Sequence, residues 1–206
     1  MISYEELFDK IINEVEIKND DFVYGITFIG PPGVGKSTIA KLISQRLGMH
    51  VSSNDKIRRM LDSLGIDAAL NQPLLERLAY EKTAYMLQNN TSIIIDANCL
   101  TAYKKVDENF AKYNSECLYI KLDCSEREVL RRISDREKNF GKNDNYSRGT
   151  KRDYDNYLNR LKNNPFPIEK IFFTINTEEK LEPQVDKLVE KINDYINNKK
   201  NKKVIK

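Results

Sequence analysis

The residues from Gly30 to Ser37 read GPPGVGKS and match the pattern G-x-x-x-x-G-K-[ST] at every required position. Glycines in such a loop let backbone N–H groups turn inward around phosphates, because no Cβ stands in the way. The lysine then reaches the β- and γ-phosphates, and the serine hydroxyl ligates Mg²⁺. Chance produces the full pattern in a chain of this length on the order of 1% of the time, which disfavours a turn that binds nothing. We therefore expect a site for ATP and Mg²⁺, with nucleotide contacts from Gly30, Gly33, Val34, Gly35, Lys36, Ser37 and Thr38.

Asp55 and Arg58 have the spacing Asp-x-x-Arg at the expected start of a helix, which places them one turn apart on one face. A carboxylate there can take the proton of an attacking hydroxyl, and a guanidinium can bind a phosphate of the acceptor. A helix cap with an i,i+3 salt bridge explains the same spacing equally well. The pair is therefore a candidate acceptor site, and Asp55 is a candidate general base.

Asp96 follows the apolar run of three isoleucines at 93–95, where a carboxylate can hold a water bound to Mg²⁺ beside Ser37. Structural aspartates are common at strand ends, but this run and the upstream loop together favour a metal site. Asn98 is a candidate for orienting the substrate, although asparagine is also a routine turn residue. We expect Ser37 and Asp96 to be the metal ligands.

Arg132 and Arg136 are i,i+4 neighbours on an expected helix and can point the same way. Two guanidinium groups over the γ-phosphoryl would stabilise the charge that spreads in a loose transition state. The alternative is a solvated helix face paired with Glu128 and Asp135. Both arginines are therefore candidates for contacting the nucleotide.

These residues need a fold that brings them together, and the apolar runs supply one. Strand candidates at about 23–29, 49–52, 93–95, 117–122 and 171–175 alternate with helical patterns. This order predicts an α/β fold, with a five-stranded parallel sheet and helices on both faces. Ligands of such sheets bind beyond the carboxyl ends of the strands, where Asp55 and Asp96 both fall.

The ends of the chain and one polar stretch complete the expected organisation. Helices are predicted at 3–17, where a capping box begins the pattern, and from about 183 to 197. Residues 137–153 are polar and contain two glycines, which favours a lid, and the Lys/Asn-rich residues 198–206 are expected to be a flexible basic tail. We expect residues 1–206 to form a single domain.

Composition limits the classes of function. The net charge is only +3, with 40% hydrophobic residues, so the charge does not demand a nucleic-acid partner. No apolar run is long enough to cross a bilayer and the amino end lacks a secretion signal, so we expect a cytoplasmic protein without a membrane partner. A single histidine and three cysteines without metal-like spacing disfavour a site for a transition metal.

Four stretches taken in order carry a resemblance to a known family. The loop with Thr38, Asn54-Asp55-x-x-Arg58, the strand 93–98 and Arg132-x-x-x-Arg136 resemble the polynucleotide 5′-hydroxyl kinase domain and its zeta-toxin-like relatives among the AAA-domain ATP-binding kinases. The match runs from about residue 24 to 136 and implies the P-loop NTPase fold. The segment 135–151 does not align, and no phosphatase or ligase motif accompanies the match.

The resemblance implies roles for individual residues. Asp55 would act as the general base, Arg58 would bind a phosphate of the acceptor, and Arg136 would meet the transferring phosphoryl group. With Lys36, these residues form the expected catalytic set. The implied reaction is the transfer of the ATP γ-phosphoryl group to a hydroxyl, best matched by the 5′-hydroxyl of a polynucleotide or nucleotide.

Other acceptors and another class of function stay open. Kinases of sugars, sugar nucleotides, metabolites and antibiotics share the loop and an acid near Asp55. Adenylate-kinase-like proteins usually have glycine after the loop lysine, where this chain has Ser37. A nucleotide-dependent switch would also use the loop, but it would need no acceptor base. The pattern indicates no oligomeric state.

Overall fold

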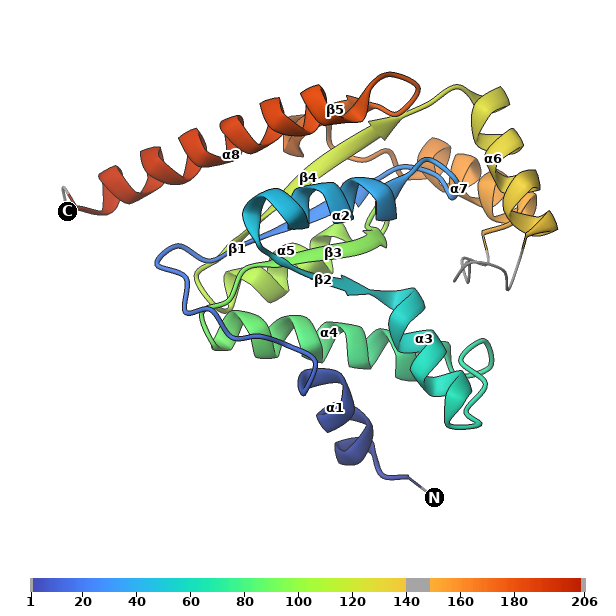
Figure 1. Cartoon of the computed structure of the whole chain (residues 1–206), viewed down its shortest axis with the longest axis horizontal. Coiled ribbons are helices and arrows are strands. Elements are labelled where there is room, and N and C mark those ends of the chain that lie inside the picture. Colours follow the sequence, from blue (N-terminus) through green and yellow to red (C-terminus); the bar gives the residue numbers. More distant parts are fainter. Residues whose placement is uncertain (1, 140–148, 205–206) are drawn as a thin grey trace.

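The computed structural model describes residues 2–139 and 149–204, with side chains as far as residue 201. Its centre is a five-stranded parallel sheet in the order β2-β3-β1-β4-β5 (Figure 1). The strands are β1 (Tyr24–Ile29), β2 (His50–Ser53), β3 (Ile93–Asn98), β4 (Glu116–Asp123) and β5 (Ile171–Asn176). The structure thus confirms the predicted α/β fold and its parallel sheet.

Helices cover both faces of the sheet (Figure 1). On one face, α2 (Lys36–Leu47) and α8 (Leu181–Val204) pack against Ile26 and Phe28 of the central strand. On the other face lie α4 (Gln72–Gln88), α5 (Tyr103–Ala111) and α7 (Lys151–Asn163), which bury residues such as Ile93 and Tyr119. Successive side chains of a strand point to opposite faces of the sheet. A strand that is buried on both faces therefore has a continuous apolar run in its sequence.

Two shorter helices flank the carboxyl end of β2. Helix α3 (Asn54–Ser63) follows this strand directly, and α1 (Tyr4–Ile12) packs on α3 and α4 through Leu7 and Ile11. Helix α6 (Glu126–Lys138) follows β4, and a 3₁₀ turn (Ile168–Lys170) precedes β5. No helix in the described parts of the chain is long and apolar enough to cross a membrane.

The helix expected over 3–17 is shorter in the structure and ends at Ile12. The residues that follow instead run along the sheet, where Lys18 N donates to Thr91 Oγ1 (3.0 Å) and Asp20 N donates to Asn90 O (2.6 Å). These hydrogen bonds tie residues 18–20 to the segment before β3. This path leaves residues 13–18 beside the carboxyl end of α2 and the start of β2.

Other element boundaries also differ from the sequence-based expectations. Within the expected lid, residues 137–153, Glu137 and Lys138 belong to α6 and residues 151–153 to α7, while 140–148 lie outside the described residues. Its role as a lid stays a prediction. The expected basic tail from 198 is helical as far as Val204, because α8 continues beyond its apolar stretch.

Candidate active site

The predicted phosphate-binding loop curls around its own lysine. Gly33 and Gly35 have φ angles of +82° and +105°, a region that other residues rarely adopt. Lys36 begins α2, and its Nζ donates to the backbone oxygens of Gly30 (3.0 Å) and Pro31 (2.7 Å). The lysine is thereby held inside the loop that the sequence pattern predicts.

A cavity of 370 Å³ lies against this loop, and we call it the loop cavity. It contains most of the predicted site residues: Gly33, Gly35, Lys36, Ser37, Thr38, Asp55, Asp96, Asn98 and Arg136. Gly30 and Val34 are not among its lining residues, because Gly30 turns its carbonyl oxygen to Lys36 and the Val34 side chain is fully buried. The loop cavity thus brings together residues from four separate stretches of the chain.

Helix α7 supplies lining residues that sequence reasoning missed. Asp153, Asn156, Tyr157 and Arg160 lie on one face of α7 and border the loop cavity. The spacing of these residues could have revealed this face. Asn156 and Tyr157 follow Asp153 by three and four positions, and Arg160 follows Asn156 by four. The signal was hidden because the whole α7 segment is rich in charged residues.

Ser37 and Asp96 form an oxygen-donor pair at the base of the loop cavity. Burial raises the pKa of Asp96, and the Ser37 side chain and the charge of Lys36 oppose this shift. Mg²⁺ is usually held by one or two protein oxygens together with waters and phosphates. The two side chains therefore fit a magnesium site. Asp96 lies within β3, which continues to Asn98, and pairs in register with Ser53 of β2.

Asn98 also forms the turn that sequence reasoning considered as its alternative role. Its Oδ1 accepts a hydrogen bond from Leu100 N (3.2 Å) and it lines the loop cavity at the same time. The turn fixes the side chain at the end of β3. Contact with a substrate stays a prediction.

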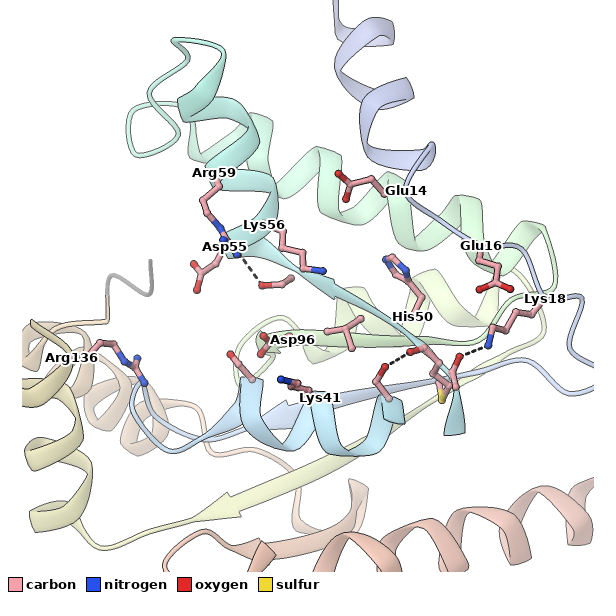
Figure 2. Close-up of a pocket in the computed structure, with 16 residues that line it drawn as sticks. Glu14, Glu16, Lys18, Lys41, His50, Asp55, Lys56, Arg59, Asp96 and Arg136 are labelled. Carbon is pink, nitrogen blue, oxygen red and sulfur yellow. Dashed lines mark hydrogen bonds between the residues drawn. The ribbon is translucent and has the colours of Figure 1, made fainter. Parts of the chain in front are cut away.

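A second and larger cavity of 730 Å³ adjoins the first, and we call it the β2 cavity (Figure 2). It runs from Asp96 and Arg136 along β2 and α3 to the residues that follow α1. The far part is lined by Glu14, Glu16 and Lys18. Four residues line both cavities and so mark their junction: Ser37, Asp55, Asp96 and Arg136.

Asp55 and Arg58 form an ion pair, but only one of them lines the cavities. Arg58 Nη1 donates to Asp55 Oδ1, as the i,i+3 alternative predicted. Asp55 lines both cavities, whereas Arg58 is a lining residue of neither. The next residue, Arg59, lines the β2 cavity (Figure 2). Arg58 therefore orients Asp55 in this structure, and its contact with an acceptor stays a prediction.

The two arginines of α6 also have different surroundings. Arg136 lines both cavities, where burial lowers its pKa and the charge of Asp55 opposes the shift. Arg132 instead joins α6 to the loop after β5, because its Nη2 donates to Thr177 O (2.8 Å) and its Nε to Glu128 Oε1 (2.8 Å). Its Nη1 reaches Val34 O at 3.4 Å. Arg132 thus braces the phosphate-binding loop, and a nucleotide contact from it stays a prediction.

His50, the single histidine of the chain, lines the β2 cavity (Figure 2). Its Nε2 is buried and has no hydrogen-bond partner among the described residues. Burial, assisted by the charges of Lys82 and Lys56, lowers the pKa of His50 to about 4. The imidazole is therefore neutral at ordinary pH.

This shift predicts a loss of stability in acid. Between pH 6.5 and 4 the unfolded chain binds a proton at His50 that the folded protein does not, so the free energy of unfolding falls as the pH falls through this window. A His50→Gln variant lacks this titration and should lose less stability over the same window. Urea unfolding of both proteins at several pH values measures the difference. Parallel pH dependences would contradict the prediction.

Comparison with known proteins identifies a family for this chain. The model of a family described as the AAA domain matches residues 26–163. The chain belongs to this family. The matched AAA-domain region contains the phosphate-binding loop, Asp55, Asp96 and both arginines of α6, whereas α1 and residues 13–18 lie outside it.

Individual proteins and solved structures with similarity to this chain share between 17% and 31% of its residues in the aligned parts. An adenylate kinase of Thermosipho melanesiensis is 31% identical over 139 residues, which cover 57% of this chain and 62% of that protein. A proposed kinase from Chloroflexus aurantiacus has a TM-score of 0.64 at 17% identity, covering 85% of this chain and 97% of the other. APS kinase of Mycobacterium tuberculosis, in complex with AMPPNP and APS, has a TM-score of 0.56 at 17% identity, covering 84% and 99%. The fold is that of small P-loop kinases.

Proposed function

We propose that the protein is a kinase that transfers the γ-phosphoryl group of ATP to a hydroxyl group of a small molecule. One observation carries the proposal: the loop cavity and the β2 cavity meet at Ser37, Asp55, Asp96 and Arg136. A nucleotide in the first cavity and an acceptor in the second would meet at this junction. An enzyme that holds both reactants in the correct orientation gains much of its rate acceleration in this way.

Each junction residue has a role in the proposed transfer. The acceptor oxygen attacks the γ-phosphorus, the bond to the leaving ADP breaks, and Asp55 takes the hydroxyl proton. Lys36 and Arg136 stabilise the negative charge on the phosphoryl oxygens. A magnesium ion at Ser37 and Asp96 supplies further neutralisation of the phosphates when bound.

A small acceptor fits the β2 cavity better than the polynucleotide 5′-hydroxyl that the sequence resemblance favours. Glu14 and Glu16 line the far part of the cavity, where a polynucleotide would carry further phosphates (Figure 2). These two glutamates outnumber Lys18 in this part of the cavity, so it offers no basic track for the successive phosphates of a polynucleotide. The nucleic-acid acceptor is therefore the alternative and not the first choice.

An adenylate kinase activity is the second candidate, because of the 31% identity to such an enzyme. An adenylate kinase transfers the phosphoryl group to a phosphate, which needs no general base. The Asp55 carboxylate at the junction would repel a phosphate acceptor, and it suits a hydroxyl that must lose a proton. The geometry thus favours the hydroxyl acceptor.

The test offers labelled ATP and Mg²⁺ to a parallel panel of acceptors. The panel contains neutral sugars, hydroxy acids, sugar phosphates, UDP-sugars, aminoglycosides, AMP, 3′-nucleotides and 5′-hydroxyl oligonucleotides. A phosphate ester formed on a small molecule supports the proposal. Label on oligonucleotides alone would restore the polynucleotide assignment, ADP formed from AMP would indicate an adenylate kinase, and no acceptor-stimulated turnover would favour a nucleotide-dependent switch.

ATP binding is expected to take up protons near pH 8. Burial lowers the pKa of Lys36 to about 8, although Asp96 partly opposes the shift. Phosphate oxygens beside the ammonium would raise this pKa again, so binding at pH 8 should take up as much as about half a proton per ATP. Calorimetric titrations in buffers of different ionisation enthalpy measure the uptake. The uptake should vanish near pH 6, where Lys36 is already charged, and equal values at both pH values would contradict the prediction.

A further inference from the structure

Lys82 of α4 is a buried lysine that the proposed reaction does not use. Its exposed fraction is 4%. Within residues 2–139 and 149–204 the structure gives its ammonium group no hydrogen bond and no ion pair. Burial lowers the pKa of Lys82, and the charge of Lys56 lowers it further, whereas Glu14 opposes both.

Lys82 lines a cavity of 560 Å³ that adjoins the β2 cavity, and we call it the α1 cavity. Glu14, Lys56 and Arg59 line both, so the two cavities share a wall at α3 and Glu14. Lys10 adds a further positive charge to the α1 cavity. Among the described residues that line this cavity, Glu14 is the single acidic one. Cationic groups therefore outnumber acidic ones at this end of the site.

A purely structural role does not account for Lys82. The Lys82 side chain is buried and its residue borders the α1 cavity, where a hydrophobic side chain of similar length would fill the same space without the cost of desolvating a charge. Residues kept at a cost in stability are typically those that bind or react. The side chain is thus placed for a ligand that carries negative charge.

We propose that Lys82, together with Lys56, binds an anionic group of the acceptor, a carboxylate or a phosphate monoester. Lys56 follows Asp55 directly on α3, so an acceptor whose anion lies between Lys56 and Lys82 would extend toward Asp55 with its hydroxyl group. His50 lies nearby, and both lysines act electrostatically on it. The acceptor class is therefore a small hydroxy compound with one acidic group. This inference rests on the proposed function for the identity of its ligand, but not for the existence of the anion site.

The experiment measures anion binding directly, with the loop cavity filled by Mg²⁺ and AMPPNP. Inorganic phosphate and acetate are titrated separately into the wild type, Lys82→Met and Lys105→Met by isothermal calorimetry. Lys105 is an exposed lysine of α5 and serves as the matched control. We expect Lys82→Met to weaken the tighter-binding anion at least about tenfold, and Lys105→Met to leave it unchanged. The anion that binds more tightly identifies the acidic group.

Every outcome decides the inference. Failure of the wild type to bind either anion would overturn it, as would equal affinities of the wild type and Lys82→Met. If Lys82→Met does not fold, Lys56→Gln replaces it, because Lys56 is exposed and the same weakening is expected. Since no turnover is measured, the result is independent of phosphoryl transfer. A bound anion with no phosphorylated acceptor would overturn the proposed function alone.

Discussion

Lys36→Ala is expected to remove nucleotide-dependent turnover, with a fall of at least roughly 10²- to 10³-fold, and to keep the fold. The Lys36 ammonium group lies inside the phosphate-binding loop, where it donates hydrogen bonds to the carbonyl oxygens of Gly30 and Pro31. Those oxygens can accept hydrogen bonds from water in the variant. Turnover of labelled ATP with the best acceptor of the panel measures the effect.

Lys105→Ala is the control for this variant, because that lysine is exposed on α5 and lines none of the three cavities. Circular dichroism and thermal unfolding show whether each variant is folded. A folded Lys36→Ala protein with near-normal turnover would remove the nucleotide assignment of the loop.

Asp55→Asn is expected to lower turnover by roughly 10²- to 10⁴-fold, the usual contribution of a general base. The affinity for ATP should change little, because Asp55 faces the junction from α3 and not from the phosphate-binding loop. Single-turnover kinetics at saturating ATP measure the chemical step, and titration with AMPPNP measures nucleotide binding. The reduced rate with retained binding is the signature of a group that acts in the transition state.

The Arg58→Met variant distinguishes two roles for Asp55, that of a general base and that of a purely structural partner of Arg58. The structure pairs Arg58 with Asp55, so if the pair only stabilises α3, both variants should lose the same modest stability and little activity. If Asp55 is the base, Asp55→Asn should be much slower than Arg58→Met. Equal rates of the two variants would argue against the catalytic role of Asp55.

The phosphate-binding loop and the sheet could be predicted from the sequence because their signals are local. The loop pattern dictates its own backbone, and the isoleucines of β3 need burial on both faces of a parallel sheet. Asp96 follows these residues along the same strand, so its position at the edge beside Ser37 follows from the topology. The residues that determine the structure of these elements lie within a few positions of one another in the sequence.

Other parts of the site depend on contacts that the sequence does not display. The spacing of Asp55 and Arg58 is the same for an acceptor site and for an ion pair, and the direction of Arg59 depends on how α3 packs. Glu14 reaches the site because α1 ends at Ile12 and the chain then leads to Lys18 and Asp20, which hydrogen-bond to residues before β3. Long-range pairing of this kind leaves no periodic pattern.

The walls of the β2 cavity have an evolutionary consequence. The residues that would handle ATP come from the loop after β1, from β3 and from α6, whereas the far wall comes from residues 14–18, outside the matched AAA-domain region. Substitutions in that short segment can change which molecule is accepted and leave the phosphoryl-transfer apparatus intact. New acceptor preferences can then arise from changes in this segment and at Lys56 and Lys82, while the phosphate-binding loop stays the same.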